Sequence, residues 1–316
     1  RKIGLRQTCN RSISITHPTL KTHSFKNGIR MKPRLLITGA TGYLGYTLIE
    51  KFKDNYEVLA YGRDKEKLIY LKETFPTIRF LDDQELTNLN FGNLDVIIHA
   101  AFLRPNKEAQ YTYQSSIDLT QWLLEKCVHY QIPKFIFISS ASIDRENYTL
   151  KSNYTLAKYS CERMLDLIAK QHTHLRLYSL RLDTLFGANP MLIPLDMVSK
   201  MILSALKNQV LILKSNKVEN RISLQEASQT IYAIANNDQL FSGVVSVRTK
   251  KPHTTHSIAR SIQCVAKESF NTDIPIVLEN DVIPDSDFEH KSSDLEEDIL
   301  ALFNHFENYK TKFTIR

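Results

Sequence analysis

A glycine-rich turn between a short apolar run and a helical pattern is the feature that most constrains the fold of this chain. The turn reads Thr38-Gly39-Ala40-Thr41-Gly42-Tyr43-Leu44-Gly45 and lies between the apolar run 34–38 and the helical pattern 43–53. Glycines at this spacing allow a tight turn, close approach of backbone to a pyrophosphate, and close packing of helix on strand. The segment therefore predicts a dinucleotide-binding turn. The residues expected to contact the cofactor here are Gly39, Thr41, Gly42, Tyr43, Leu44 and Gly45.

Short apolar runs continue to alternate with helical patterns after this turn. The expected strands are 34–38, 57–61, 78–81, 95–100, 134–139 and 174–182, and the expected helices are 43–53, 65–75, about 107–130 and 152–171. This alternation is typical of a parallel sheet covered by helices on both faces. We expect an α/β fold with a doubly wound parallel sheet (Rossmann fold) over 31–187. A smaller α/β substrate-binding region, interleaved with the first, is expected over 188–316.

The net charge of +7 comes from the first 30 residues. They carry seven basic and no acidic side chains, whereas the remaining 286 residues carry 34 of each, so no basic domain predicts nucleic-acid binding. Residues 1–30 have the composition of a mitochondrial transit peptide. An apolar strand begins soon after Met31, however, which favours upstream translated sequence or sequence introduced in cloning. We expect this leader to be disordered.

The cysteines and the apolar runs exclude several further classes. The four cysteines, at positions 9, 127, 161 and 264, show no paired spacing, so neither a metal site nor a disulfide framework is predicted. No apolar run approaches the roughly 18–20 residues needed to span a bilayer. We therefore expect a cytoplasmic protein with a small-molecule substrate, and with neither a membrane nor a nucleic acid as partner.

A tyrosine and a lysine stand four residues apart in Tyr154-Thr155-Leu156-Ala157-Lys158. This spacing is about one helical turn, so the phenol and the ammonium share one face of a helix. A neighbouring ammonium favours the phenolate and lowers a pKa that is ordinarily near 10. Such a phenol can exchange a proton with an alcohol or a ketone near neutral pH. The pair predicts a general acid/base, Tyr154, assisted by Lys158.

The end of the second expected strand bears on the choice of dinucleotide. Enzymes that use NAD normally present an acid there to the ribose 2′-hydroxyl, but Gly62 stands at that position and Arg63 follows. An arginine suits a 2′-phosphate. Arg63 favours NADP, and NAD remains the alternative if Arg63 is only a solvated loop residue and Asp64 supplies the acid.

Several independent motifs resemble the extended short-chain dehydrogenase/reductase family, in its NAD-dependent epimerase/dehydratase group, over roughly 33–265. The matching segments are the TGxxGxxG turn at 38–45, DVIIHAA at 95–101, FISSAS at 137–142, the YxxxK pair at 154–158, and RLDTLFG at 181–187. The resemblance implies NAD(P)-dependent chemistry on a sugar or nucleotide-sugar hydroxyl or keto group.

The resemblance also assigns roles to single residues. Asp82 is expected to contact the adenine amino group, and Ala100 and Ala101 to pass near the nicotinamide ribose. Lys158 is expected to bind the ribose hydroxyls, and Ser140 to hydrogen-bond the same substrate oxygen as Tyr154. The family also often forms homodimers. A homodimer is expected, although the apolar residues Leu119, Trp122 and Leu123 suit either a dimer contact or the core.

Departures from the family pattern narrow the reaction. The 4,6-dehydratases of this group place Asp and Glu after the hydroxyl residue of the serine strand, but Ala141 and Ser142 stand here, so dehydration is disfavoured. The arginine that clamps a nucleotide-sugar diphosphate falls on Glu219. Arg221, two residues on and on the same strand face, is a candidate replacement that would bind substrate together with Ser140 and Tyr154.

A reductase and a C4 epimerase both remain open. Arg63 tilts the prediction toward a reductase, because a reductase exchanges its cofactor and often uses NADP. The alternative from another class is a non-catalytic NADP-binding redox sensor or interaction protein. Such proteins typically lack the Tyr/Lys pair that this chain has at 154 and 158.

Overall fold

The structure is a computed structural model that describes residues 25–26, 29–30, 32–103, 113–150, 152–190, 196–249, 252–279 and 293–312. The predicted leader, 1–30, lies outside the described residues apart from β1 (Phe25–Lys26) and β2 (Ile29–Arg30), which pair antiparallel. Among the described residues, no helix is both long enough and apolar enough to cross a membrane.

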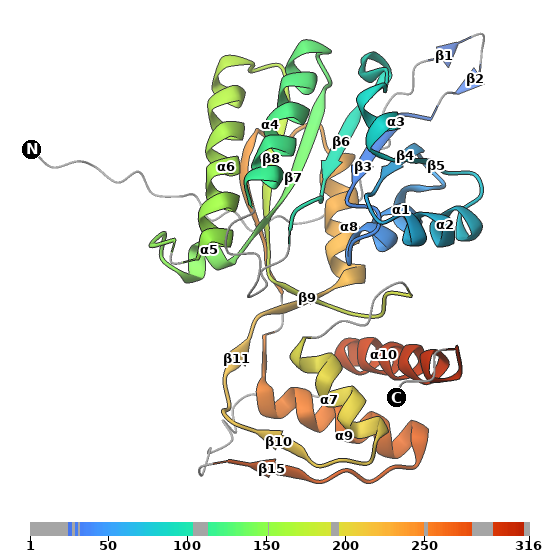
Figure 1. Cartoon of the computed structure of the whole chain (residues 1–316). Helices are drawn as coiled ribbons and strands as arrows, with labels where there is room; N and C mark the ends of the chain where they lie inside the picture. The colour runs from blue at the N-terminus through green and yellow to red at the C-terminus, as the bar shows by residue number, and fades with distance from the viewer. Residues whose placement is uncertain are drawn as a thin grey trace, which may run out of the picture.

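Seven parallel strands form the central sheet in the described part of the chain (Figure 1). From one edge to the other they are β13 (Gly243–Val247), β8 (Arg176–Leu182), β7 (Lys134–Ser140), β6 (Val96–His99), β3 (Arg34–Thr38), β4 (Glu57–Tyr61) and β5 (Arg79–Leu81). The winding direction reverses between β3 and β6, and doubly wound sheets bind ligands at such a point. The predicted doubly wound α/β fold is confirmed.

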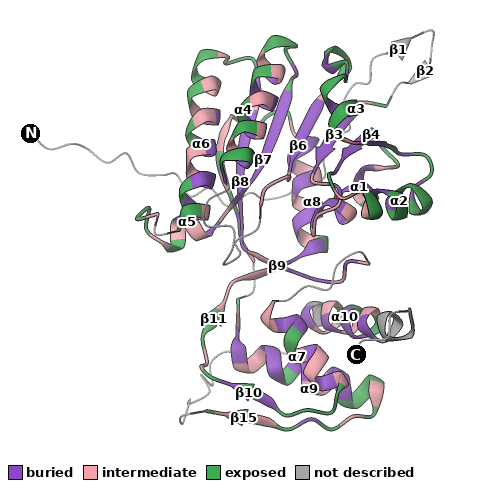
Figure 2. Ribbon diagram, in the orientation of Figure 1, coloured by how far each residue is buried: buried purple, intermediate pink, exposed green. Residues whose placement is uncertain are grey.

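Helices cover both faces of this sheet. One face carries α1 (Gly45–Phe52), α2 (Lys65–Thr74) and α8 (Leu224–Ala235), and the other carries α3 (Asp83–Thr87), α4 (Gln114–His129) and α6 (Asn153–Gln171). Successive strand side chains point to opposite faces, so Leu35 and Ile37 enter one core and Leu36 enters the other. Figure 2 shows the buried strands between the two helical layers.

The apolar face of α4 belongs to the core of the chain. Leu123 is fully buried, and the Trp122 ring packs edge-on against Phe91 of the short helix η1 (Phe91–Asn93) at 5.5 Å. Leu119 is partly buried against the same core. Of the two alternatives left open for these side chains, their contacts support packing in the core, and the homodimer stays a prediction.

The C-terminal half forms a third core below the sheet (Figure 1). Its elements are α7 (Met197–Leu206), α9 (Thr255–Phe270), α10 (Ser293–Lys312), and the parallel pair β10 (Leu211–Leu213) with β15 (Ile276–Leu278). Two further pairs connect it to the sheet: β9 (Thr184–Phe186) with β12 (Arg221–Ser223), and β11 (Val218–Glu219) with β14 (His253–Thr254). Between these segments, the chain returns to the central sheet, where α8 covers one face and β13 forms an edge strand.

The expected and observed bounds agree to within two residues for the strands of the first half. The long helix differs, because α4 begins at Gln114 rather than near 107. The expected residues 107–112 lie outside the described part of the chain, and Tyr113 is the N-cap.

Candidate active site

The glycine turn joins β3 to α1 at the carboxyl edge of the sheet. Gly39 has φ +80°, and a Cβ there would lie 2.7 Å from the Ala101 amide nitrogen, so this position requires glycine. A Cβ at Gly45 would lie 2.5 Å from the Ala40 carbonyl oxygen, and closer still to that of Gly39. The tight turn and the close helix packing that the sequence predicts are both present.

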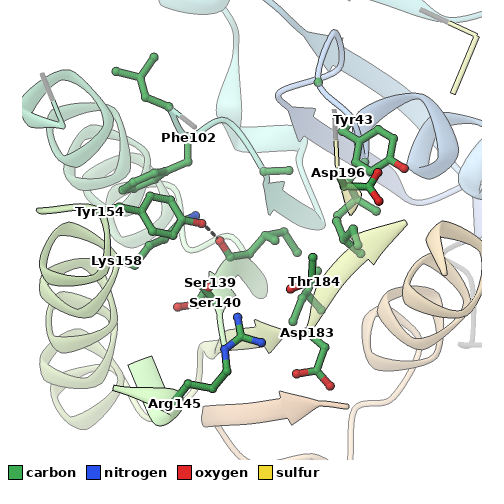
Figure 3. Close-up of a pocket in the computed structure, with 17 residues that line it drawn as sticks. Tyr43, Phe102, Ser139, Ser140, Arg145, Tyr154, Lys158, Asp183, Thr184 and Asp196 are labelled. Carbon is green, nitrogen blue, oxygen red and sulfur yellow. Dashed lines mark hydrogen bonds between the residues drawn. The ribbon is translucent and has the colours of Figure 1, made fainter. Parts of the chain in front are cut away.

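A cavity of about 350 Å³ lies beside this turn (Figure 3). Its lining reaches from the glycine turn through the ends of β6 and β7 to Asp196, the N-cap of α7, so the cavity lies between the sheet and the C-terminal region. The residues of the sequence-based site that line it are Gly42, Tyr43, Leu44, Ala100, Ser140, Tyr154 and Lys158. Gly39, Thr41, Gly45, Arg63, Asp82, Ala101 and Arg221 do not line it.

The start of α6 positions the tyrosine and the lysine. Ser152 is the N-cap, and its Oγ accepts a hydrogen bond from the Thr155 amide at 3.1 Å. Tyr154 therefore lies in the first helical turn and Lys158 one turn later, both facing the cavity (Figure 3). Nζ of Lys158 donates to the Ile138 carbonyl oxygen at 2.5 Å.

The ammonium of Lys158 is almost entirely removed from water, with 3% of the residue exposed. Burial lowers its pKa from 10.5 to about 7, and the neighbouring Cys161 and Glu162 oppose this shift only in part. Lys158 is thus a group whose charge changes near neutral pH, directly behind Tyr154.

An aromatic wall surrounds this pair. Nζ of Lys158 lies 3.8 Å from the ring centroid of Phe102, and the Tyr154 ring lies 5.9 Å from the rings of both Phe102 and Tyr113. Such contacts stabilise a cation and restrict the phenol. Phe102 was not predicted as a site residue, although it directly follows the expected cofactor residues Ala100 and Ala101.

The two serines at the end of β7 have different surroundings. Ser139 Oγ donates to Glu162 Oε1 at 2.5 Å and is buried. Ser140 Oγ accepts from the Ser142 amide at 3.2 Å and lies 2.8 Å from Ser142 Oγ. Ser142 opens α5 (Ser142–Arg145), so this short helix holds the Ser140 hydroxyl at the cavity.

A chain of ion pairs, unexpected from the sequence, lies behind the serines. Arg181 binds both carboxylate oxygens of Glu162, at 2.9 and 2.6 Å, and also binds Asp144. Arg248 bridges Asp144 and Asp183, the latter at 3.0 Å. The network joins residues up to about 100 positions apart in the chain, so no local pattern predicts it.

His99 is a structural residue in this site. Its Nδ1 lies 2.7 Å from Thr38 Oγ1 and its Nε2 lies 2.9 Å from Thr120 Oγ1. Burial, and then the charge of Lys158, lower the His99 pKa to about 3, so the imidazole is neutral at physiological pH.

The end of β4 packs closely against the side chain of Thr41 in the glycine turn. A Cβ on Gly62 would lie 2.6 Å from Thr41 Cγ2, so the glycine packs directly against the turn. Asp64 is the N-cap of α2, accepting from the Lys67 amide at 3.1 Å and pairing with the Lys67 ammonium. Arg63 is exposed between them, and the described residues offer its guanidinium no hydrogen bond or ion pair.

Asp82 directly follows β5 and caps α3. Its Oδ1 accepts from the Glu85 amide at 2.9 Å, and the Glu85 carboxylate accepts from the Asp82 amide at 3.0 Å. This reciprocal capping box fixes Asp82 at the carboxyl edge of the sheet beside β4. The expected contact with adenine stays a prediction.

Arg221 begins β12 and lies next to the cavity without lining it. Its guanidinium is 3.4 Å from Asp196 and 3.5 Å from Glu219. The Nε atom is buried and lacks hydrogen-bond geometry to either carboxylate. The two acids neutralise the candidate diphosphate clamp, and its contact with substrate stays a prediction.

Together these groups place a phenol, a hydroxyl and a titratable ammonium on one side of a cavity whose opposite side begins at a glycine turn. A phenol and a hydroxyl in one cavity can exchange a proton with, and hydrogen-bond to, a single oxygen of a bound molecule.

Known proteins share both the sequence pattern and the fold. A UDP-N-acetylglucosamine 4,6-dehydratase (inverting) of Campylobacter jejuni is 28% identical over 123 residues, which are 34% of this chain and 36% of that protein. This chain thus matches about a third of the length of that relative.

Two solved structures illustrate the similarity of fold. The UDP-N-acetylglucosamine 4-epimerase of Methanobrevibacter ruminantium M1, in complex with UDP-N-acetylmuramic acid, superposes with a TM-score of 0.70 at 19% identity, over 88% of this chain and 99% of that one. The UDP-glucuronic acid 4-epimerase of Bacillus cereus, in complex with NAD, superposes with a TM-score of 0.66 at 19% identity. The match covers 87% of this chain and 99% of that one.

The sequence model of one family spans the turn, the serine strand, the tyrosine helix and the entry into the C-terminal region. It matches residues 35–222, more than half of the chain. The protein is therefore a member of the NAD dependent epimerase/dehydratase family.

Proposed function

We propose that this protein is an NAD(P)-dependent oxidoreductase or epimerase that acts on a hydroxyl or keto group of a sugar or nucleotide sugar. The observation that carries the proposal is the cavity that Gly42, Tyr154, Lys158 and Ser140 line together. Family membership supports the same class of reaction. The proposal includes a homodimer, as the family often forms.

The residues of the cavity have distinct roles in this proposal. The glycine turn and Lys158 hold the dinucleotide, whose nicotinamide supplies hydride exchange when bound. Tyr154 gives or takes the proton of the substrate oxygen. Ser140 donates its hydroxyl proton to that oxygen and polarises it. In this role Ser140 Oγ accepts from the Ser142 amide at 3.2 Å and from Ser142 Oγ at 2.8 Å.

Elimination of water is disfavoured by the side chains beside Ser140. Ala141 is buried and Ser142 hydrogen-bonds Ser140, so neither supplies the extra acid/base pair that dehydration requires. The two carboxylates that line the cavity, Asp183 and Asp196, are each paired with an arginine. Epimerisation and reduction are the reactions that remain.

The proposed cofactor is NADP, with NAD as the alternative. Gly62 stands where an NAD site presents its acid and packs against the Thr41 side chain, and Asp64 caps its own helix. Arg63 is exposed and makes no hydrogen bond or ion pair among the described residues. The Bacillus cereus neighbour, in contrast, was solved in complex with NAD. The two dinucleotides must therefore be compared directly.

Mass spectrometry of the purified protein and its melting temperature with each dinucleotide test this proposal. We expect retained NAD(H) or a larger shift with NADP(H). An Arg63→Gln variant should lose about tenfold or more in NADP affinity, the scale of a charge-assisted contact. Arg260→Gln, at an exposed position of α9, is the matched control. If neither dinucleotide is retained or shifts the melting temperature, the proposal is wrong.

A further inference from the structure

Arg145 lines the cavity at the end of the short helix that holds Ser140. Helix α5 runs from Ser142, which contacts Ser140, to Arg145, whose amide donates to the Ala141 carbonyl oxygen at 3.1 Å. At about 1.5 Å per residue, Arg145 lies roughly 4.5 Å along the axis from Ser142. Figure 3 shows its guanidinium directed between Ser140 and Thr184.

The other charged groups of the cavity already have partners. Nζ of Lys158 donates to the Ile138 carbonyl. Asp183 accepts from Arg248 at 3.0 Å and from the Thr249 amide at 3.1 Å.

Asp196 is likewise engaged. It caps α7, accepts from Ser199 Oγ at 2.7 Å, and pairs with Arg221 at 3.4 Å. Among the described residues, the guanidinium of Arg145 has no hydrogen bond or ion pair, although it faces the same cavity.

The acids next to Arg145 in sequence are not available to it. Both carboxylate oxygens of Asp144 are taken, one by Arg181 and the other by Arg248. Oε1 of Glu146 accepts from Thr155 Oγ1 at 2.8 Å. These contacts leave Arg145, an exposed residue that lines the cavity, without either neighbouring acid as a partner.

We propose that Arg145 is a specificity residue that binds a carboxylate carried by the sugar ring of the substrate. The inference rests on the proposed function, in which Ser140 hydrogen-bonds an oxygen of the reacting carbon. Because Arg145 lies one helical turn from Ser142, which contacts Ser140, its guanidinium would reach a substituent on the sugar ring whose oxygen Ser140 binds. The planar guanidinium fork matches a carboxylate in geometry and charge.

Paired ligands that differ by one carboxylate test this proposal. UDP-glucose and UDP-glucuronic acid are titrated into dinucleotide-loaded protein by calorimetry, with wild type, Arg145→Gln, Arg145→Lys and Arg163→Gln. Arg163 is an exposed arginine of α6, paired with Asp166, and serves as the matched control.

We expect the wild type and Arg163→Gln to bind UDP-glucuronic acid about 10-fold or more tightly than UDP-glucose, whose sugar ring carries no charge. Arg145→Gln should remove this preference, and Arg145→Lys should retain part of it because the charge remains and the fork is lost. The melting temperature of each variant with dinucleotide confirms the fold.

Equal affinity for the two ligands, failure to bind the carboxylated one, or an unchanged preference in Arg145→Gln would overturn the assignment of Arg145. Each of these results leaves dinucleotide binding intact. Loss of dinucleotide binding by the wild type would instead contradict the proposed function, so the two failures are distinguishable.

Discussion

At the scale of single residues, the buried ammonium of Lys158 connects the chemistry of the site to stability. Its pKa falls from 10.5 in an exposed lysine to about 7 because burial disfavours the charge. Below pH 7 both the native and the unfolded state carry the proton, and the cost of burying the charge is present in full. Between pH 7 and about 10.5 the native state releases the proton while the unfolded state keeps it, so stability rises across this window.

Replacement of this lysine isolates the effect. Lys158→Met should be more stable than the wild type at pH 7 by at least about 1 kcal/mol, since each unit of pKa difference corresponds to about 1.36 kcal/mol. The difference should shrink as the pH rises toward 10. Urea unfolding of the dinucleotide-free protein at several pH values measures it.

Lys170→Met provides the control for this series. Lys170 is an exposed lysine in the last turn of α6, and its substitution should shift stability by less than about 0.5 kcal/mol with no trend over the same pH range. A constant difference between Lys158→Met and the wild type from pH 6 to 10 would show that the buried ammonium does not titrate in this window.

The burial and contacts of a residue cannot be predicted from the local sequence when its partners are distant in the chain. Lys134 opens an apolar strand, where a lysine is ordinarily exposed, yet only 1% of it is accessible. Nζ donates to the Ala235 carbonyl at 2.5 Å and pairs with Asp238 at 3.0 Å, so it caps the end of α8 about 100 residues later. The residues near Lys134 in the sequence therefore do not predict this contact.

At the scale of elements, the turn between β3 and α1 depends on the absence of a side chain at Gly45. An added Cβ meets backbone carbonyl oxygens of the turn, which cannot rotate away as a flexible side chain can. Gly45→Ala should therefore cost roughly 2 kcal/mol or more in unfolding free energy and weaken dinucleotide binding.

Chemical unfolding and a dinucleotide titration measure both effects. Gly92→Ala is a suitable comparison. A Cβ at Gly92 would lie no closer than 3.3 Å to another heavy atom, the side-chain oxygen of Asn90, so the loss of unfolding free energy should be below about 1 kcal/mol. Equal stability of Gly45→Ala and the wild type would contradict the tight packing of this turn.

Periodicity was sufficient for the elements that build the sheet. The strands β3 and β4 have the predicted bounds, because buried parallel strands are continuous apolar runs flanked by turn residues. The short helices α3 and α5 were not predicted. Each has five residues or fewer, so a helical period cannot be recognised, and their caps and ion pairs define them instead.

At the scale of the whole molecule, the candidate site lies between two regions with separate cores. The sheet supplies the glycine turn, the serine strand and the tyrosine helix, and the C-terminal region supplies Asp196. In the first region, Tyr154 and Lys158 were predicted because their spacing is local, and Ser140 was predicted from the resemblance of its strand to the family. Asp196 was missed, since its place at the cavity follows from how the two regions meet, and Arg145 was missed because it belongs to the four-residue helix α5. Asp183 was missed because its contacts with Arg248 and Thr249 are distant in the chain.

In the proposed reaction, Tyr154 moves a proton while hydride passes between a dinucleotide and a hydroxyl-bearing carbon. The most direct measurement mixes protein loaded with oxidised dinucleotide with UDP-sugars and follows the near-ultraviolet absorbance of reduced nicotinamide. We predict that this band appears in the wild type. In Tyr154→Phe, which still binds the dinucleotide, the rate at which the band appears should be roughly 10²–10⁴-fold lower. A dinucleotide that is bound but never reduced, with identical behaviour in both proteins, would contradict catalysis and favour a non-catalytic sensor.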